Sequence, residues 1–236
     1  MNLEFLSWGR SGFLDELFFG ALNTLAIGLA AFALGLALGQ LGAIAKLYGN
    51  PIARWLAEIY TTVVRAVPEL VLIFILFFAG TRGISSISES LGFGPAQINE
   101  MMAAILVLGF VQGAYSTEVI RAAIQSIPQG QIEAARAFGM SGAQTMRRVI
   151  IPAMLPNALP GLANLWLVVI KDTALISVVG GSPELAQATK RAAGFTKHYF
   201  LFYVVAGAIY LAITLGSNRI IAYFEKSMRR GQAKIV

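Results

Sequence analysis

Residues 17–45 read LFFGALNTLAIGLAAFALGLALGQLGAIA, a run that contains no charged side chain. About 20 mostly apolar residues, wound as a helix, cross the hydrocarbon core of a bilayer. This run is therefore long enough to predict a transmembrane helix. Four further stretches are similarly long and mostly apolar, and they complete a set of five predicted spans: 56–79, 101–119, 159–179 and 200–224.

The composition places the whole chain in the same class. It is 57% hydrophobic and 13% charged, with a mean hydropathy of +0.70, whereas a soluble globular domain carries about 25% charged residues. The continuous apolar runs also differ from the alternating strands of an outer-membrane barrel. We therefore predict an all-α integral membrane protein in which residues 1–236 form one transmembrane domain of five helices.

Two residue types limit the chemistry of this chain. It has no cysteine and a single histidine, His198. Disulfides, thiol catalysis and a metal site built from several histidines of this chain are excluded on that count. We predict no metal and no cofactor on the chain itself.

The basic residues predict an orientation, because cytoplasmic loops of membrane proteins are enriched in Lys and Arg. This rule favours an N-terminus outside and a C-terminus in the cytoplasm. It also accounts for the net charge of +6 without a nucleic-acid partner. The inner basic residues are then Lys46, Arg54, Arg121, Arg136, Arg147, Arg148, Lys226, Arg229, Arg230 and Lys234, and the fewer outer ones are Arg10, Arg82, Lys190, Arg191 and Lys197.

The loop between the third and fourth spans carries the most information. Residues 126–152 read SIPQGQIEAARAFGMSGAQTMRRVIIP and predict two short helices joined by a turn. Ile132, Ala135 and Phe138 fall at helical spacing and predict an apolar stripe on one face of the first helix.

Gly139 suits the end of the first helix, since glycine adopts the left-handed conformation found there. Ser141 and Gln144 form a capping-box pattern for the second helix. Pro152 and Pro156 are expected to break the chain before the fourth span. Such a loop either packs on its own bundle or docks a partner.

This loop resembles the EAA motif of the permease subunits of ATP-binding-cassette (ABC) importers. Glu133, Ala134 and Ala135 are followed at the motif's spacing by Gly139 and by the VIIP sequence that ends in Pro152. Four other stretches resemble signatures of the HisQ-like permeases of polar amino acid importers: NTL at 23–25, YTTVVRAVPEL at 60–70, GAYSTE at 113–118 and KDTAL at 171–175.

The resemblance implies that the chain is half of a permease dimer in a bacterial inner membrane. The loop would be a cytoplasmic coupling helix that docks on a dimer of ATPase subunits, and those subunits would hold ATP and Mg. The implied coupling residues are Glu133, Ala134, Ala135, Gly139 and Pro152. A solute-binding protein would deliver polar, basic amino acids or opines. A paralogous second permease is expected, with a homodimer as the alternative. This chain itself contains no G-x-x-x-x-G-K-[ST] phosphate loop.

Charged residues within the predicted spans give a candidate substrate path. Arg65 and Glu69 are four residues apart, so a continuous helix would place them on one face. Acidic Glu69 and Asp172 suit a cationic amino acid, and Arg65 suits its carboxylate. Lys171 and Tyr115 complete the candidate path. The alternative is a structural ion pair between spans. Glu118 and Arg121 are expected at a solvated helix end.

Three other functions are alternatives for this sequence. An importer of another polar amino acid, such as glutamine or glutamate, would share the docking loop. A stand-alone channel would need no docking helix. An intramembrane enzyme is disfavoured, because the near-match to G-x-S-x-G at residues 139–143 lies on the side opposite His198.

Overall fold

The computed structural model describes residues 3–9, 12–95, 98–180 and 182–228, and these contain helices and no strand. The predicted all-α membrane fold is confirmed, since five helices are long and apolar enough to cross a bilayer: Leu14–Tyr48, Glu69–Ser90, Glu100–Gln125, Gly142–Val179 and Tyr199–Met228. The basic residues Arg10, Arg229, Arg230 and Lys234 lie outside the described residues.

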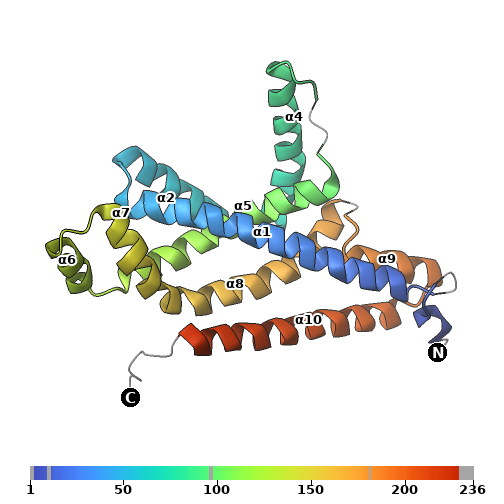
Figure 1. Ribbon diagram of the computed structural model, residues 1–236. Helices are drawn as coiled ribbons and strands as arrows, with labels where there is room; N and C mark the ends of the chain where they lie inside the picture. Colours follow the sequence, from blue (N-terminus) through green and yellow to red (C-terminus); the bar gives the residue numbers. More distant parts are fainter. Residues whose placement is uncertain (1–2, 10–11, 96–97, 181, 229–236) are drawn as a thin grey trace.

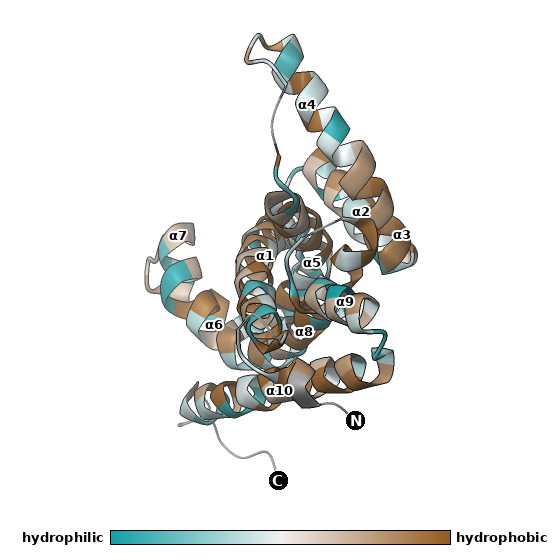
Figure 2. Ribbon diagram, turned by 90° about the vertical axis from the view of Figure 1, so that its right-hand side faces the viewer, coloured by the Kyte–Doolittle hydropathy of each residue, from teal (hydrophilic) through white to brown (hydrophobic). Residues whose placement is uncertain are grey.

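The elements follow one another as η1 (Leu3–Leu6), α1 (Leu14–Tyr48), α2 (Pro51–Ala66), α3 (Glu69–Ile75), η2 (Leu76–Gly80), α4 (Thr81–Ser90), α5 (Glu100–Gln125), α6 (Gln129–Ala137), α7 (Gly142–Thr145), η3 (Met146–Ile150), α8 (Ile151–Val179), α9 (Leu185–Thr196) and α10 (Tyr199–Met228). Helices α1, α5 and α8 run side by side, and α10 lies across one side of them (Figure 1 and Figure 2). The loop helix α6 lies at one end of this bundle, and the N-terminus and α9 lie at the other.

Helices α1 and α5 form the most extensive pair in the bundle. Gly35 and Gly39 of α1 lie directly against Gln112 and Ser116 of α5: a Cβ added to Gly39 would be 2.5 Å from the Ser116 Cβ. Small residues at this spacing let two helix backbones approach closely. In a membrane this matters because van der Waals packing, and not the hydrophobic effect, drives helices to associate. This contact fixes the centre of the fold. Around it, hydrophobic residues dominate the long bundle helices, while α4 and α9 carry more hydrophilic ones (Figure 2).

The second predicted span, 56–79, is not one helix. Helix α2 ends at Ala66, Val67 takes an extended conformation, and α3 begins only at Glu69. Pro68 explains the break, because its ring disfavours helical geometry in the preceding residue and it offers no N–H. The continuous helical run apolar enough to span a membrane is Glu69–Ser90, which includes part of the segment expected to connect two spans.

Pro152 and Pro156 lie within a continuous helical run and do not interrupt it. Pro152 and Pro156 were expected to break the chain before the fourth span, and this is wrong: Gly142 to Val179 is one continuous helical run. The π-helical turn η3 directly precedes Pro152, and in such a turn the N–H of Ile151 reaches back to the carbonyl of Met146. Its wider winding accommodates a proline ring that ordinary helical bonding would exclude.

Candidate functional site

The loop between α5 and α8 forms a compact projection with one packed face and one free face. Ile132 and Ala135 turn inward, where Ile132 packs against the buried cluster around Ile124 and Ile150. Glu133 and Ala134 are exposed. The loop therefore packs on its own bundle with one face and leaves the other uncovered, and three of the predicted coupling residues, Glu133, Ala134 and Ala135, lie on one short helix.

The end of α6 is a Schellman turn built on Gly139. Gly139 has φ +76°, and its N–H donates to the carbonyl of Arg136 while the N–H of Met140 donates to that of Ala135. These two bonds satisfy helix-end carbonyls and require a left-handed residue. Ser141 and Gln144 then form the predicted capping box at the start of α7. Both local predictions are confirmed.

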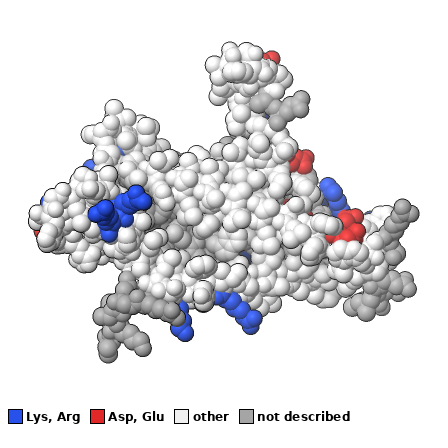
Figure 3. Space-filling view, viewed as in Figure 1, with Lys and Arg blue, Asp and Glu red and all other residues white. Residues whose placement is uncertain are grey.

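The side chain of Phe138 is not buried, contrary to what its helical spacing predicts. Its spacing from Ile132 and Ala135 predicts a common buried face, yet its side chain is 86% exposed. Helix α6 ends at Ala137, so Phe138 lies at the start of the turn, where no other element covers its side chain. An exposed phenylalanine on a projecting loop is a candidate anchor for a protein partner. Basic side chains gather at this end of the molecule (Figure 3).

A second candidate site lies where α2, α3, α5 and α8 meet. The Arg65 guanidinium lies 6.0 Å from the centre of the Tyr115 ring. Tyr115 and Asp172 both lie close enough to Glu69 to interact with it. Four of the five residues predicted for the substrate path are thus brought together, and Lys171 is exposed next to Asp172.

Arg65 does not pair with Glu69, because the helix break at Val67 and Pro68 separates the two residues. Its carboxylate partner is Glu118, with 4.0 Å between Nη1 and Oε2. Glu118 also binds Lys46 at 2.6 Å and Arg121 at 2.8 Å. The expectation of a solvated helix end is therefore wrong for Glu118, whose side chain is only 17% exposed, whereas the Arg121 side chain is 33% exposed.

Lys46 completes this charge network, which ties three helices together. Its side chain is 5% exposed, and its Nζ also lies 2.7 Å from Glu58 on α2. Sequence reasoning missed Lys46, since it follows the first apolar run and was counted as a loop residue. The signal that could have found this network is the i,i+3 spacing of Glu118, at the end of a predicted span, and Arg121, just beyond it.

A buried carboxylate at the start of α9 was also missed. Glu184 is fully buried, and its two oxygens accept hydrogen bonds from the backbone N–H groups of Ala186 and Gln187 and from the Tyr210 hydroxyl. Thr24, from the NTL signature, accepts from the N–H of Leu185 beside it. Burial raises the pKa of the Glu184 carboxyl above its ordinary value, and the backbone donors only partly oppose this effect.

This raised pKa predicts a pH dependence. A carboxyl whose pKa is higher in the folded state than in the unfolded state adds stability below its ordinary pKa, and this stability is lost as pH rises through the folded pKa. We expect the wild-type chain to become less stable, relative to Glu184→Gln, as pH rises from about 4.5 toward 8. Thermal unfolding in detergent across this range measures the difference, and parallel curves for the two proteins would contradict it.

No group of three or more metal-ligating residues occurs in the part of the chain that the structure describes. His198 is exposed, with its ring 5.3 Å from that of Phe5.

Comparison with known proteins identifies the family. Residues 31–230 match the family described as "Binding-protein-dependent transport system inner membrane component". The nopaline transport system permease protein NocQ of Agrobacterium fabrum is 43% identical over 98% of both chains. The histidine/lysine/arginine/ornithine transport system permease protein HisQ of Escherichia coli is 39% identical, over 91% of this chain and 94% of HisQ.

A solved structure agrees with these relatives. A chain of the "amino acid ABC transporter with histidines" superposes with a TM-score of 0.77 and 31% identity, over 96% of this chain and all of that one. The family consists of transport subunits whose ATPase activity is on a separate subunit, which decides against the enzyme and channel alternatives. From its sequence, its five apolar helices and its fold, this chain belongs to the family of binding-protein-dependent transport system inner membrane components.

Proposed function

We propose that this chain is one of two permease subunits that carry basic amino acids into the bacterial cytoplasm: histidine, arginine, lysine, ornithine or opines. The names of HisQ and NocQ support this substrate class. The charge cluster supports it independently. Glu69 and Asp172 offer negative charge to a cationic side chain, while Arg65 offers a guanidinium to the substrate carboxylate.

The observation that carries the transport mechanism is the exposed face of the docking loop. Phe138, Glu133 and Ala134 project from the end of the bundle that also holds the end of α10. A cytoplasmic ATPase subunit docks on this face, so ATP binding moves α6 and, through Ile132, the inner ends of α1 and α5. The N-terminus and α9, at the opposite end, then face the outside and meet the solute-binding protein.

A second permease subunit closes the substrate path. Arg65 is 47% exposed although it lies beside the bundle's intramembrane charge cluster. A charged side chain facing lipid costs about 2.5–3.5 kcal/mol on insertion scales, so these residues need a protein or water environment. A second permease subunit that covers α2 and α3 supplies it, and the similarity to HisQ and NocQ favours a paralogue in this place.

A substitution in the turn at Gly139 tests the docking mechanism. We expect Gly139→Val to insert normally but to lose about tenfold or more in ATP-driven uptake, because an L-residue in the left-handed region costs about 1–2 kcal/mol and valine would deform the docking turn. Uptake of radiolabelled arginine into proteoliposomes that contain the permeases, the ATPase and the binding protein measures this.

Gly142→Val is the matched control, since Gly142 lies in the same loop, has open space around it and lacks the positive φ. Phe138→Ala should likewise lower the recovery of the ATPase with the purified permease. Wild-type uptake by Gly139→Val would sink the docking mechanism, and absence of arginine uptake by the wild-type complex would sink the proposed substrate.

A further inference from the structure

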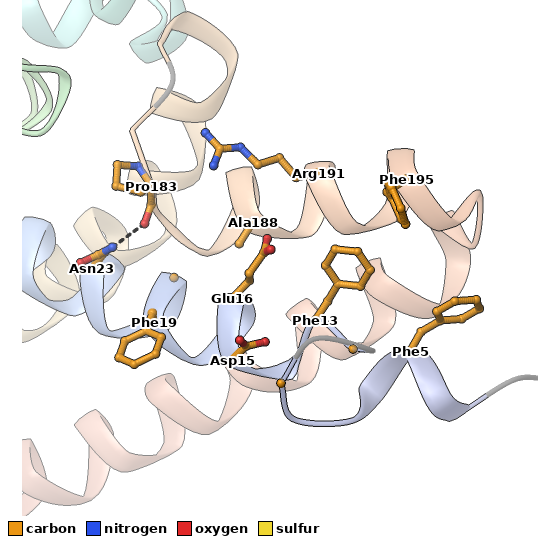
Figure 4. A pocket seen from close by; sticks show the side chains of 13 residues that line it. Phe5, Phe13, Asp15, Glu16, Phe19, Asn23, Pro183, Ala188, Arg191 and Phe195 are labelled. Carbon is orange, nitrogen blue, oxygen red and sulfur yellow. Dashed lines mark hydrogen bonds between the residues drawn. The ribbon is translucent and has the colours of Figure 1, made fainter.

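A cavity of about 840 Å³ lies at the N-terminal end of the bundle, between α1 and α9. It is within the size range of about 300–1,000 Å³ that is usual for small-molecule sites. Figure 4 shows its walls: carboxylates from α1, a guanidinium from α9 and several phenylalanine rings. The walls that matter here are Asp15, Glu16, Arg191, Phe13, Phe19 and Phe195.

Two contacts hold α1 and α9 antiparallel on either side of this cavity. At one, Gly20 lets the helices nearly touch, because a Cβ on it would be 3.0 Å from the Leu185 Cα. At the other, the rings of Phe13 and Phe195 lie 5.7 Å apart. Glu16 and Arg191 fall between these two contacts along the chain. The cavity walls therefore stand on two helices whose spacing is fixed by packing.

The charged side chains of this cavity have no partners of their own. Among the described residues, no hydrogen bond or ion pair involves the side chains of Asp15, Glu16 or Arg191. Arg191 and Glu16 are exposed, so water can satisfy them. Asp15 is different, since its Oδ1 is buried and lacks a donor. A buried carboxylate oxygen without a donor is costly, and such a group calls for a ligand or an ion.

We propose that this cavity binds a basic amino acid whose α-carboxyl, α-amino and side-chain groups are all ionised, as a first site on the N-terminal side of the permease. The α-carboxylate would meet Arg191, and the cationic groups would meet Asp15 and Glu16. The phenylalanine rings would cover the aliphatic stem and offer their faces to the cation. Among the described residues that line the cavity, two carboxylates and one guanidinium carry a net charge of −1, which complements the net +1 of arginine or lysine.

This inference rests on the proposed function and extends it, because the cavity is separate from the intramembrane cluster. Glu69 and Asp172 stand on α3 and α8, whereas the cavity is lined by residues of η1, α1 and α9 and the short segments around them. A substrate released at the N-terminal end would meet the cavity before it reaches those residues. The cavity would hold it by charge and aromatic contact.

The test is equilibrium binding of radiolabelled arginine to the purified permease–ATPase complex in lipid nanodiscs, without nucleotide and without the binding protein. Asp15→Asn and Arg191→Gln each remove one charged interaction, and we expect each to weaken arginine binding at this site about tenfold. Lys190→Gln is the matched control, because Lys190 is the exposed neighbour of Arg191 on α9 and does not line the cavity. It should leave binding unchanged.

Uptake in proteoliposomes separates the two proposals. If the wild-type complex imports arginine but Asp15→Asn and Arg191→Gln bind it like wild type, the cavity inference is overturned and the proposed function stands. If these variants bind arginine like wild type but no longer retain the solute-binding protein in a pull-down, the cavity is a docking site for that protein, and the inference is again overturned. If the wild-type complex neither binds nor imports arginine, both proposals fail. Weakened binding in both variants, with Asp172→Asn retaining this site, supports the inference.

Discussion

Gly39→Ala is expected to destabilise the protein, although the same change at Gly216 is expected to be neutral or slightly stabilising. Alanine favours a helix over glycine by about 1 kcal/mol, so the change should help wherever there is room. Gly216 on α10 has open space around it, whereas an added Cβ at Gly39 would lie 2.5 Å from the Ser116 Cβ and 3.0 Å from its backbone carbon. The α5 backbone cannot yield as a flexible side chain would.

The expected cost of Gly39→Ala is about 1–3 kcal/mol, which is typical of overpacking, and Gly39→Leu should abolish recovery of folded protein. Fluorescence-detected size exclusion of membranes that express each variant measures recovery, and thermal unfolding of the purified complex measures stability. Equal melting temperatures for Gly39→Ala and Gly216→Ala would show that α1 and α5 do not pack as the structure has them.

Glu118→Gln has the second large expected effect. The change keeps the shape of the side chain but leaves three cations, Lys46, Arg65 and Arg121, around a neutral amide. Lys46 is 5% exposed and would retain only Glu58. Removing one partner from a buried ion pair strands the other charge, at a cost of about 3–5 kcal/mol. We expect loss of about this size in unfolding free energy, together with loss of transport.

Glu58→Gln provides the control, because Glu58 binds the same Lys46 nitrogen at nearly the same distance but is 64% exposed. A pair with an exposed member contributes about 0–1 kcal/mol. Adding Lys46→Met to Glu118→Gln should restore stability, since it removes the stranded charge. Similar losses for Glu58→Gln and Glu118→Gln, or no rescue by Lys46→Met, would contradict the role given to this network.

In the EAA loop, rules that involve only neighbouring residues predicted the local structure correctly at two positions. Gly139 ends α6 in the left-handed conformation, and Ser141 caps α7, because each depends on a few neighbouring residues. Phe138 shows where the rule stops. Its helical spacing predicts the side of α6 on which it lies but not whether another element covers that side, and its side chain is 86% exposed.

The intramembrane charges show a different limit. Arg65 and Glu69 have the spacing of an ion pair on one helix, yet Arg65 pairs with Glu118 from another helix. Their spacing predicts contact only if the helix is continuous, and Pro68 interrupts it. Lys46 and Glu118 are far apart in the sequence, so only the packing of α1 on α5 brings them within 2.6 Å.

The sequence by itself determined the membrane class, the helical fold and the docking loop, because apolar run length, turn chemistry and capping act over a few residues. The tertiary structure alone decided which charges pair, which glycines lie between helices and where α1 and α9 enclose a cavity. These features depend on residues far apart in the chain that meet only when close-packed helices fix the distances between them.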